Sequence, residues 1–207
     1  MGMFSFEYLK NKYNLNIKGI IHVGAHKGEE VDEYFKCGVS NIILVEPIPY
    51  ICDDLKTRLK HTNIKIFQLA LSDVNGESDF YVTNHTMSSS LLKLKYHKVI
   101  EPNVVEIEKI SVITKRFETL VEENNIIMDD YNFLTIDVQG AELLVLKGFG
   151  DLLKNIDYIV SEINREELYD KCALESDIDN MLLPMNFIKQ EECFEVPTWG
   201  DIFYVRR

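Results

Sequence analysis

The chain has 207 residues, a formal net charge of −12 at pH 7 and an apolar fraction of 46%. This composition predicts one globular domain with a buried core and excludes a disordered chain. The negative charge disfavours nucleic acid as a partner, because binding phosphates requires a concentrated basic face. The local basic cluster of Lys93, Lys95, His97 and Lys98 is too small for that role. A solvated loop is the favoured interpretation of this cluster, and a small-anion site is the alternative.

Cysteine usage and hydropathy indicate a soluble, cytoplasmic protein. The four cysteines are far apart and contain no Cys-x-x-Cys pair, so neither a zinc site nor a disulfide framework is expected. No segment approaches the roughly 18 consecutive apolar residues of a membrane span. Residues 1–10 lack the basic flank and apolar core of a secretion signal. Other domains of a longer chain remain possible partners, and a membrane is not expected as one.

Short apolar runs alternate with amphipathic runs, which is typical of a parallel sheet covered by helices on both faces. The expected strands are 19–23, 41–45, 64–69, 133–136 and 158–160. The expected helices are 29–37, 50–60, 141–147 ended by Gly148, and 176–183 ended by Pro184. Residues 187–191 and 202–205 then predict an antiparallel pair joined by a turn around 197–200.

Residues 78–113 interrupt this alternation. They contain a short strand at 80–82, a polar run at 83–90, a basic helix or loop, and a strand at 108–113. Insertions of this length between regular units are usually functional or disordered. With no repeat and no Gly/Ser linker, we expect a single domain over 1–207 that carries an insertion at about 78–113.

A glycine-containing loop, His22-Val-Gly-Ala-His-Lys-Gly28, follows the first predicted strand. Glycines let the backbone approach a ligand, and the following helix N-terminus offers free N–H groups. His26 replaces the second glycine of the dinucleotide fingerprint, which disfavours pyrophosphate.

Glu46 stands at the end of the second predicted strand and is followed by Pro47. A carboxylate there can accept both ribose hydroxyls of a nucleoside lying across the strand ends. A glycine loop and a ribose acid without a phosphate site indicate a nucleoside such as S-adenosylmethionine. The alternative is a tight turn with a solvent-facing Glu.

Two further strand ends carry polar residues. Ala70-Leu-Ser-Asp73 follows the third predicted strand, and Asp137 follows the apolar run 133–136. We expect Asp137 at the same sheet edge as Gly24 and Glu46. A structural Asp that caps the helix beginning near Gly140 is the alternative.

On these motifs the chain resembles the FkbM-type S-adenosylmethionine-dependent methyltransferases over about residues 18–206. The most specific string is Ile136-Asp-Val-Gln-Gly-Ala-Glu142 running into Leu146-Lys-Gly-Phe149. Ser89-Ser90-Leu91, Ser161-Glu-Ile163 and Gly200-Asp-Ile-Phe203 agree with it. The chain departs from the family at His22, where Asp is common, and at His26, where Asn is frequent.

The resemblance implies an α/β fold, the Rossmann-like class I methyltransferase fold. Its seven-stranded, mostly parallel sheet has the order 3-2-1-4-5-7-6, an antiparallel last strand and helices on both faces. It also implies S-adenosylmethionine as cofactor and O-methylation of a sugar, glycan or natural-product hydroxyl. The cofactor-binding residues so predicted are His22, Gly24, Ala25, His26, Gly28, Glu46, Pro47, Ala70, Leu71, Ser72, Ser89 and Asp137.

Methyl transfer to a sugar hydroxyl requires alignment and removal of a proton. Asp137 is the first candidate for the base or hydroxyl-orienting group, and Glu162 is the second. His85, in the polar insertion, could approach the substrate or be an exposed loop residue. Asp137 and Glu162 could instead hold a divalent cation with help from Asn164, although a metal is not favoured. Glu142 could equally be an acid at a helix N-terminus.

Other residues have two interpretations each. Trp199 could stack on a sugar or anchor a turn. His61 and His97 are expected at the surface, and the insertion, with its serines and lysines, is expected to form an acceptor wall or a lid. The rival to an O-methyltransferase is a catalytically inactive methyltransferase-like module for binding or assembly.

Overall fold

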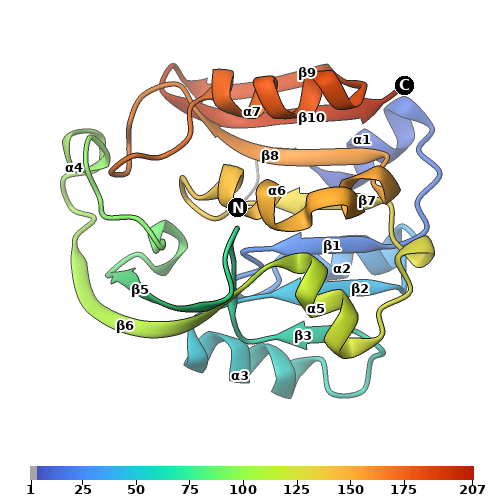
Figure 1. The fold of residues 1–207 in the computed structure, drawn as a ribbon, viewed down its shortest axis with the longest axis horizontal. Helices are drawn as coiled ribbons and strands as arrows, with labels where there is room; N and C mark the ends of the chain where they lie inside the picture. The colour runs from blue at the N-terminus through green and yellow to red at the C-terminus, as the bar shows by residue number, and fades with distance from the viewer. Residues whose placement is uncertain (1–3) are drawn as a thin grey trace.

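The computed structural model describes residues 4–207 and is built around a central seven-stranded sheet (Figure 1). Residues 1–3, which belong to the segment predicted to lack a secretion signal, lie outside the described residues. The central strands are β1 (Ile20–Val23), β2 (Ile42–Val45), β3 (Lys65–Phe67), β7 (Phe133–Ile136), β8 (Tyr158–Asn164), β9 (Phe187–Val196) and β10 (Trp199–Arg206).

The strand order β3-β2-β1-β7-β8-β10-β9 confirms the predicted order 3-2-1-4-5-7-6. Strands β3, β2, β1, β7 and β8 pair in parallel, whereas β10 is antiparallel to both β8 and β9. The predicted α/β class with a mostly parallel sheet and an antiparallel last strand is therefore confirmed. Because parallel strands end at the same edge, residues that follow β1, β2 and β7 are brought together.

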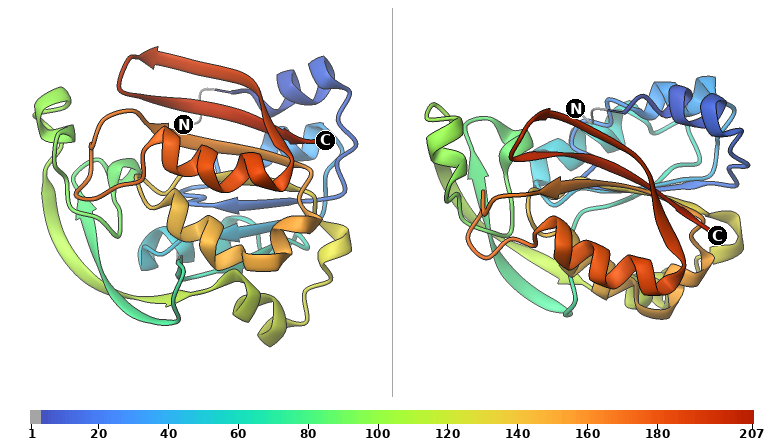
Figure 2. Two further views of the ribbon diagram at one scale, coloured as in Figure 1. Left: turned by 45° about the horizontal axis from the view of Figure 1, so that its top comes forward. Right: turned by 90° about the horizontal axis from the view of Figure 1, so that it is seen from above.

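Helices cover both faces of the sheet (Figure 2). The α-helices are α1 (Phe6–Tyr13), α2 (Val31–Lys36), α3 (Pro49–Arg58), α4 (His97–Ile100), α5 (Phe117–Asn124), α6 (Glu142–Phe149) and α7 (Glu175–Leu182). Short 3-10 helices are η1 (Thr86–Ser88), η2 (Met128–Asp130), η3 (Gly150–Asn155) and η4 (Leu183–Met185).

Every residue of β1 and β2 is buried, which explains why these strands are continuous apolar runs. Alternate residues enter different cores: Ile21 and Ile43 pack with α5, α6 and α7, whereas Ile20 and Ile42 pack with α1 and α2. At about 25 cal/mol per Å² of buried apolar area, these two cores supply the main favourable term in folding.

Several element predictions need correction. The helix expected to stop at Gly148 continues to Phe149, and a side chain at position 148 would meet the Ser72 carbonyl oxygen at 2.2 Å. Gly148 therefore permits close packing of α6 and does not end it. Pro184 lies inside η4, and the terminal hairpin strands are longer than predicted. Strand β8 extends to Asn164 and so includes Glu162.

Two helices were not predicted. In α1, the Ser5 side chain accepts a hydrogen bond from the Tyr8 N–H, and Phe6 and Leu9 are buried. In α5, Phe117 and Leu120 are buried. Both helices carry apolar residues at i and i+3, a signal that was present in the sequence but short.

The segment around the predicted insertion forms a second sheet beside the strand ends. Strand β6 (Glu106–Lys115) pairs with β4 (Ala70–Leu71) and with β5 (Gly76–Thr83), and η1 and α4 lie between β5 and β6. Figure 1 shows β5, β6 and α4 projecting beyond the edge of the main sheet. This position allows the insertion to border any site at that edge.

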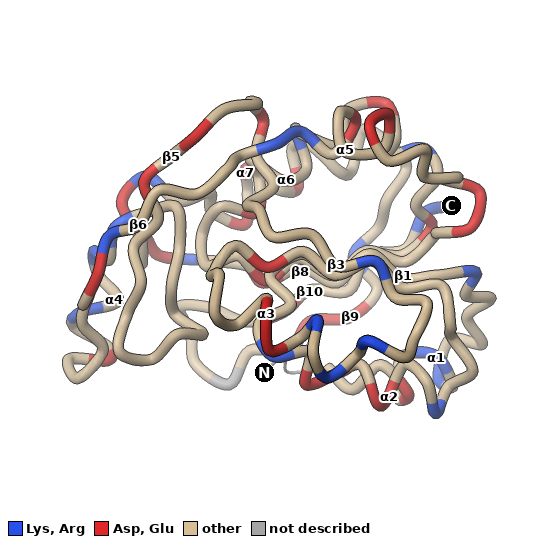
Figure 3. Tube along the Cα trace, turned by 90° about the horizontal axis from the view of Figure 1, so that it is seen from below, with Lys and Arg blue, Asp and Glu red and all other residues tan. Residues whose placement is uncertain are grey.

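Charges are mixed over the surface. Figure 3 shows acidic and basic residues interspersed along the chain, without a continuous basic stripe in that view. Lys95 pairs with Glu167, Lys98 pairs with Glu106, and Lys93 lies over the Tyr81 ring. Within residues 4–207, no helix has the length and apolar character needed to span a membrane.

Candidate active site

The carboxyl ends of β1, β2 and β7 converge as predicted. The N–H groups of Gly24 and Ala25 each donate to the Val45 carbonyl oxygen at 3.0 Å. Gly24 has φ +81°, and a Cβ there would lie 1.8 Å from the Asp137 carbonyl oxygen. A glycine is therefore required where the first loop crosses the end of β7.

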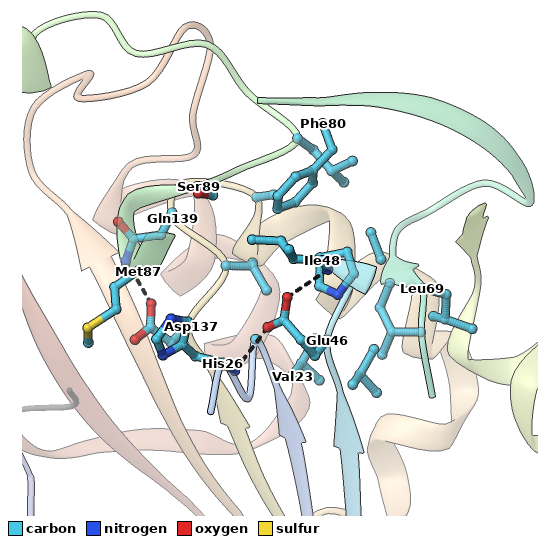
Figure 4. Close-up of a pocket in the computed structure, with 18 of the residues that line it drawn as sticks. Val23, His26, Glu46, Ile48, Leu69, Phe80, Met87, Ser89, Asp137 and Gln139 are labelled. Carbon is cyan, nitrogen blue, oxygen red and sulfur yellow. Dashed lines mark hydrogen bonds between the residues drawn. The ribbon is translucent and has the colours of Figure 1, made fainter. Parts of the chain in front are cut away.

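A cleft, which we call the rim cleft, opens above these strand ends (Figure 4). Its walls are largely apolar and include Ile48, Leu69, Leu71, Phe80 and Leu91. The polar groups that line it lie at the strand ends and on the insertion. Such a mixture of apolar walls and a few fixed polar groups is typical of small-molecule sites.

Glu46 is the buried acid of the rim cleft, with 4% of its surface exposed. Its carboxylate accepts hydrogen bonds from the His26 N–H at 2.9 Å and the Ile48 N–H at 2.8 Å. Burial raises the pKa of Glu46 to about 7, and these two N–H groups oppose the rise. The alternative of a solvent-facing Glu46 is wrong.

The two loop histidines are placed differently. His26 has φ +44°, and its imidazole lies 2.8 Å from both Glu29 Oε1 and Thr86 Oγ1, so it links the first loop to the insertion. His22 is buried on the α2 face, where its Nδ1 lies 3.1 Å from the Tyr34 hydroxyl. His26 therefore lines the rim cleft, whereas His22 lines a small neighbouring cavity.

The remaining predicted cofactor residues fall into three groups. Pro47, Ala70, Leu71, Ser89 and Asp137 line the rim cleft with Gly24 and Glu46. Ala25 lines the small neighbouring cavity with His22. Gly28 and Ser72 line neither space. Gly28 instead has φ +66° and accepts a hydrogen bond from Arg58, which makes it a turn residue.

A second space, the side cavity, adjoins the rim cleft and has a volume of about 370 Å³. It is lined by predicted residues from distant segments, namely His85, Asp137, Glu162, Asn164 and Trp199. Asp137 lines both spaces and so stands at their boundary. Asp137 and Glu162, the two candidates for the base, both contact one side chain, described next.

Gln139 is the residue that the sequence reasoning missed. Its Nε2 donates to Asp137 Oδ1 at 2.7 Å and to Glu162 Oε2 at 2.8 Å. The Tyr169 hydroxyl donates to Gln139 Oε1 at 2.6 Å and thereby sets which end of the amide faces the acids. Gln139 adopts φ +58°, a left-handed conformation that is rare for this residue type. The string around Asp137 included Gln139, but no sequence signal shows that its side chain bridges two acids.

The buried acids titrate abnormally. Burial raises the pKa of Asp137, and the Gln139 amide opposes the rise. Burial raises the pKa of Glu162 well above its usual value, and the charges of Asp137, Glu142 and Asp201 add to this. Asp201 is the cross-strand partner of Glu162. A carboxyl surrounded by other carboxyls favours its protonated form.

Glu142 supports the backbone of the site. Its Oε1 accepts the N–H groups of Val138 at 3.2 Å and Gly140 at 3.0 Å, and burial raises its pKa to about 7. These bonds match the expected acid at a helix N-terminus. Within residues 4–207, no group of three or more His, Cys, Asp or Glu is arranged to hold a metal ion.

Two histidine predictions had different outcomes. His61 is exposed, as expected. The surface prediction for His97 is wrong, because His97 is 9% exposed, lines the side cavity and packs on the Tyr169 ring at a centroid distance of 5.5 Å. The surface prediction followed from the basic residues that flank His97 in the sequence, which do not indicate that its side chain faces inward.

The comparisons with known proteins agree with this geometry. The 2-O-methyltransferase NoeI of Sinorhizobium fredii is 26% identical over 161 residues, which are 73% of this chain and 65% of that protein. The chain therefore spans just under two thirds of this curated relative.

Two solved structures share the fold. The methyltransferase FkbM from Methylobacillus flagellatus KT has a TM-score of 0.56 and 14% identity, over 90% of this chain and 43% of that chain. The magnesium protoporphyrin IX methyltransferase from Synechocystis PCC 6803, solved with bound S-adenosylmethionine, has a TM-score of 0.54 and 10% identity, over 97% and 76%. The family model "Methyltransferase FkbM domain" matches residues 22–193, and the chain belongs to this family.

Proposed function

We propose that the protein is an S-adenosylmethionine-dependent O-methyltransferase that methylates a hydroxyl of a sugar, glycan or related natural product. Family membership and the relative named as a 2-O-methyltransferase support the reaction class. The observation that carries the proposal is the position of Asp137, a residue that lines both the rim cleft and the side cavity. One acid can thus lie between a methyl donor in the rim cleft and a hydroxyl acceptor in the side cavity.

The residues that line the rim cleft suit the nucleoside part of the cofactor. The buried Glu46 carboxylate would accept the ribose hydroxyls, and the apolar wall that includes Leu71 would cover the adenine. Gly24 leaves room for the methionine part to cross the end of β1. These assignments use residues that the structure brings to one cleft.

The rim cleft is narrow, at about 50 Å³, whereas ligand pockets commonly measure about 300–1,000 Å³. Thr86, Met87 and Ser89 of the insertion form one wall of it. Entry of the cofactor therefore requires the cleft to widen, and an outward movement of this wall would break the contact between His26 and Thr86. The insertion would then act as a lid that excludes water.

When bound, S-adenosylmethionine supplies an electrophilic methyl group for in-line transfer to the acceptor oxygen. Asp137 would accept the hydroxyl proton or orient the hydroxyl, because its raised pKa makes it a stronger base than an ordinary Asp. The raised pKa of Glu162 favours its protonated form, which could donate a hydrogen bond to the acceptor. His85 lies across the side cavity as a further polar contact.

Two measurements test the function. Calorimetry should detect S-adenosylhomocysteine binding, with little affinity for NAD, and a labelled methyl donor should transfer label to members of a saccharide panel. Asp137→Asn should abolish transfer while the protein still folds. Asp53→Asn, the same change on the exposed surface of α3, is the matched control and should transfer normally.

Three outcomes would contradict the proposal. Absence of binding at high micromolar ligand would remove the cofactor assignment. Methylation of a protein nitrogen or a nucleobase, without methylation of any saccharide, would contradict the acceptor assignment alone. Cofactor binding without transfer to any acceptor would favour the inactive binding or assembly module.

A further inference from the structure

The side cavity has an unusual charge balance for a space of its size. Four of its lining residues are acids, namely Glu101, Asp137, Glu162 and Asp201, and neither Lys nor Arg is among the described residues that line it. The lysines of the insertion do not compensate, because Lys95 and Lys98 are paired with Glu167 and Glu106 outside this lining. Even with Glu162 in its protonated form, the lining holds other acids and no Lys or Arg, so the electrostatic potential inside the cavity is negative.

Two residues that line the side cavity carry buried polar atoms without a hydrogen-bond partner among the described residues. Asn164 is 2% exposed, and its Nδ2 is unpartnered. His97 is 9% exposed, and its Nδ1 is unpartnered. Buried polar groups in folded proteins are almost always satisfied, so two unsatisfied groups on residues that line one cavity favour a ligand that binds in it and completes them.

These two groups are uncharged and can form hydrogen bonds with hydroxyls. The Asn164 amide donates to an oxygen lone pair. Burial lowers the pKa of His97, so its imidazole is neutral and can accept or donate a hydrogen bond. Trp199 adds an aromatic side chain to the same wall, and aromatic side chains combine a large apolar surface with a polar end.

We propose that the side cavity selects an uncharged polyhydroxylated ring and rejects anionic sugars such as uronates and sugar phosphates. This inference rests on the proposed function and specifies its acceptor. An anionic substituent would enter the field of the carboxylates without a Lys or Arg in the lining to neutralise it. The repulsion between like charges then disfavours binding. We expect at least a tenfold preference for the neutral ring.

The experiment uses pairs of rings that differ only in charge: methyl glucoside with methyl glucuronide, and methyl galactoside with methyl galacturonide. Saturation-transfer NMR on the full chain, with and without S-adenosylhomocysteine, measures binding independently of turnover. The neutral member of a pair should bind and the uronate should not. Equal binding of both members, or binding of neither in every pair, overturns the proposal.

A charge reversal at the exposed edge of the cavity sharpens the test. Glu101 is exposed, so Glu101→Lys should fold normally. It should lower the ratio of the affinity for the neutral ring to the affinity for the uronate by at least threefold. Glu122→Lys makes the same change of charge on α5, outside the cavity lining, and should leave the ratio unchanged. An unchanged ratio in Glu101→Lys contradicts the inference.

Binding and turnover separate the two proposals. Neutral rings that bind with the expected preference but receive no methyl group would refute the O-methyltransferase and leave the charge selection standing. Methyl transfer accompanied by equal binding of neutral rings and uronates would refute the charge selection and leave the O-methyltransferase standing.

Discussion

Removal of the Glu46 carboxylate should weaken binding of the nucleoside part of the cofactor. In the free protein this carboxylate already accepts two backbone N–H groups, and Glu46→Ala leaves both without that acceptor whether ligand is present or not. The loss in binding therefore reflects mainly the ribose hydroxyls. Hydrogen bonds of this kind contribute about 1–3 kcal/mol, which corresponds to roughly 5- to 150-fold in affinity.

The assay is calorimetry with 5′-methylthioadenosine, which carries the ribose and adenine but no amino acid group that titrates. An analogue without the two ribose hydroxyls completes a double-mutant cycle. Loss of the hydroxyls should weaken binding to the wild-type protein as much as Glu46→Ala does, and should have little effect on Glu46→Ala. Full additivity of the two losses would show that the ribose is held elsewhere.

The same contact predicts a pH dependence. Burial raises the pKa of Glu46 to about 7 in the free protein, and hydroxyl donors favour its ionised form. Ligand binding therefore lowers this pKa and releases a proton, so affinity should rise as the pH increases towards about 7 and should level off above it. Proton release, measured in buffers of different ionisation enthalpy, should disappear in Glu46→Gln. Affinity that is flat between pH 5.5 and 8.5 would refute the reasoning.

Three further predictions concern the strand ends. Gln139→Ala should lower kcat by about tenfold and move the rising limb of the pH–rate profile to higher pH, since the amide holds down the pKa of the Asp137 carboxyl; an unmoved limb would contradict this positioning role. Gly24→Ala should unfold at least about 4 °C below Gly38→Ala, because both glycines have φ +81° but only Gly24 would place a Cβ against backbone. Glu162→Gln should stabilise the protein more at pH 8 than at pH 4.5 in urea titrations. The pKa of Glu162 is raised in the folded state, so the wild-type protein loses stability as the pH rises above the pKa that this acid has in the unfolded chain. An equal stabilisation by Glu162→Gln at both pH values would contradict this reasoning.

Local pattern was sufficient to locate the central strands and the residues at their carboxyl ends, whereas the strand order was implied by the family resemblance. Strands buried on both faces must be continuous apolar runs, and β1, β2 and β7 could be located on that basis. Parallel pairing then brings all their carboxyl ends to one edge. The position of Gly24, Glu46 and Asp137 at one edge thus follows from periodicity and chain direction.

Contacts between distant segments were beyond the reach of local pattern. The orientation of Gln139 depends on Tyr169, 30 residues later, and Glu162, the second acid to which its amide donates, comes from β8. His97 lies in a basic stretch whose composition is typical of a surface, yet packing against Tyr169 buries it. Gly148 has the sequence context of a helix end but lies inside α6, because the backbone at Ser72 approaches it. Each of these positions depends on a neighbour that only the folded chain brings near, so no window of sequence contains the information.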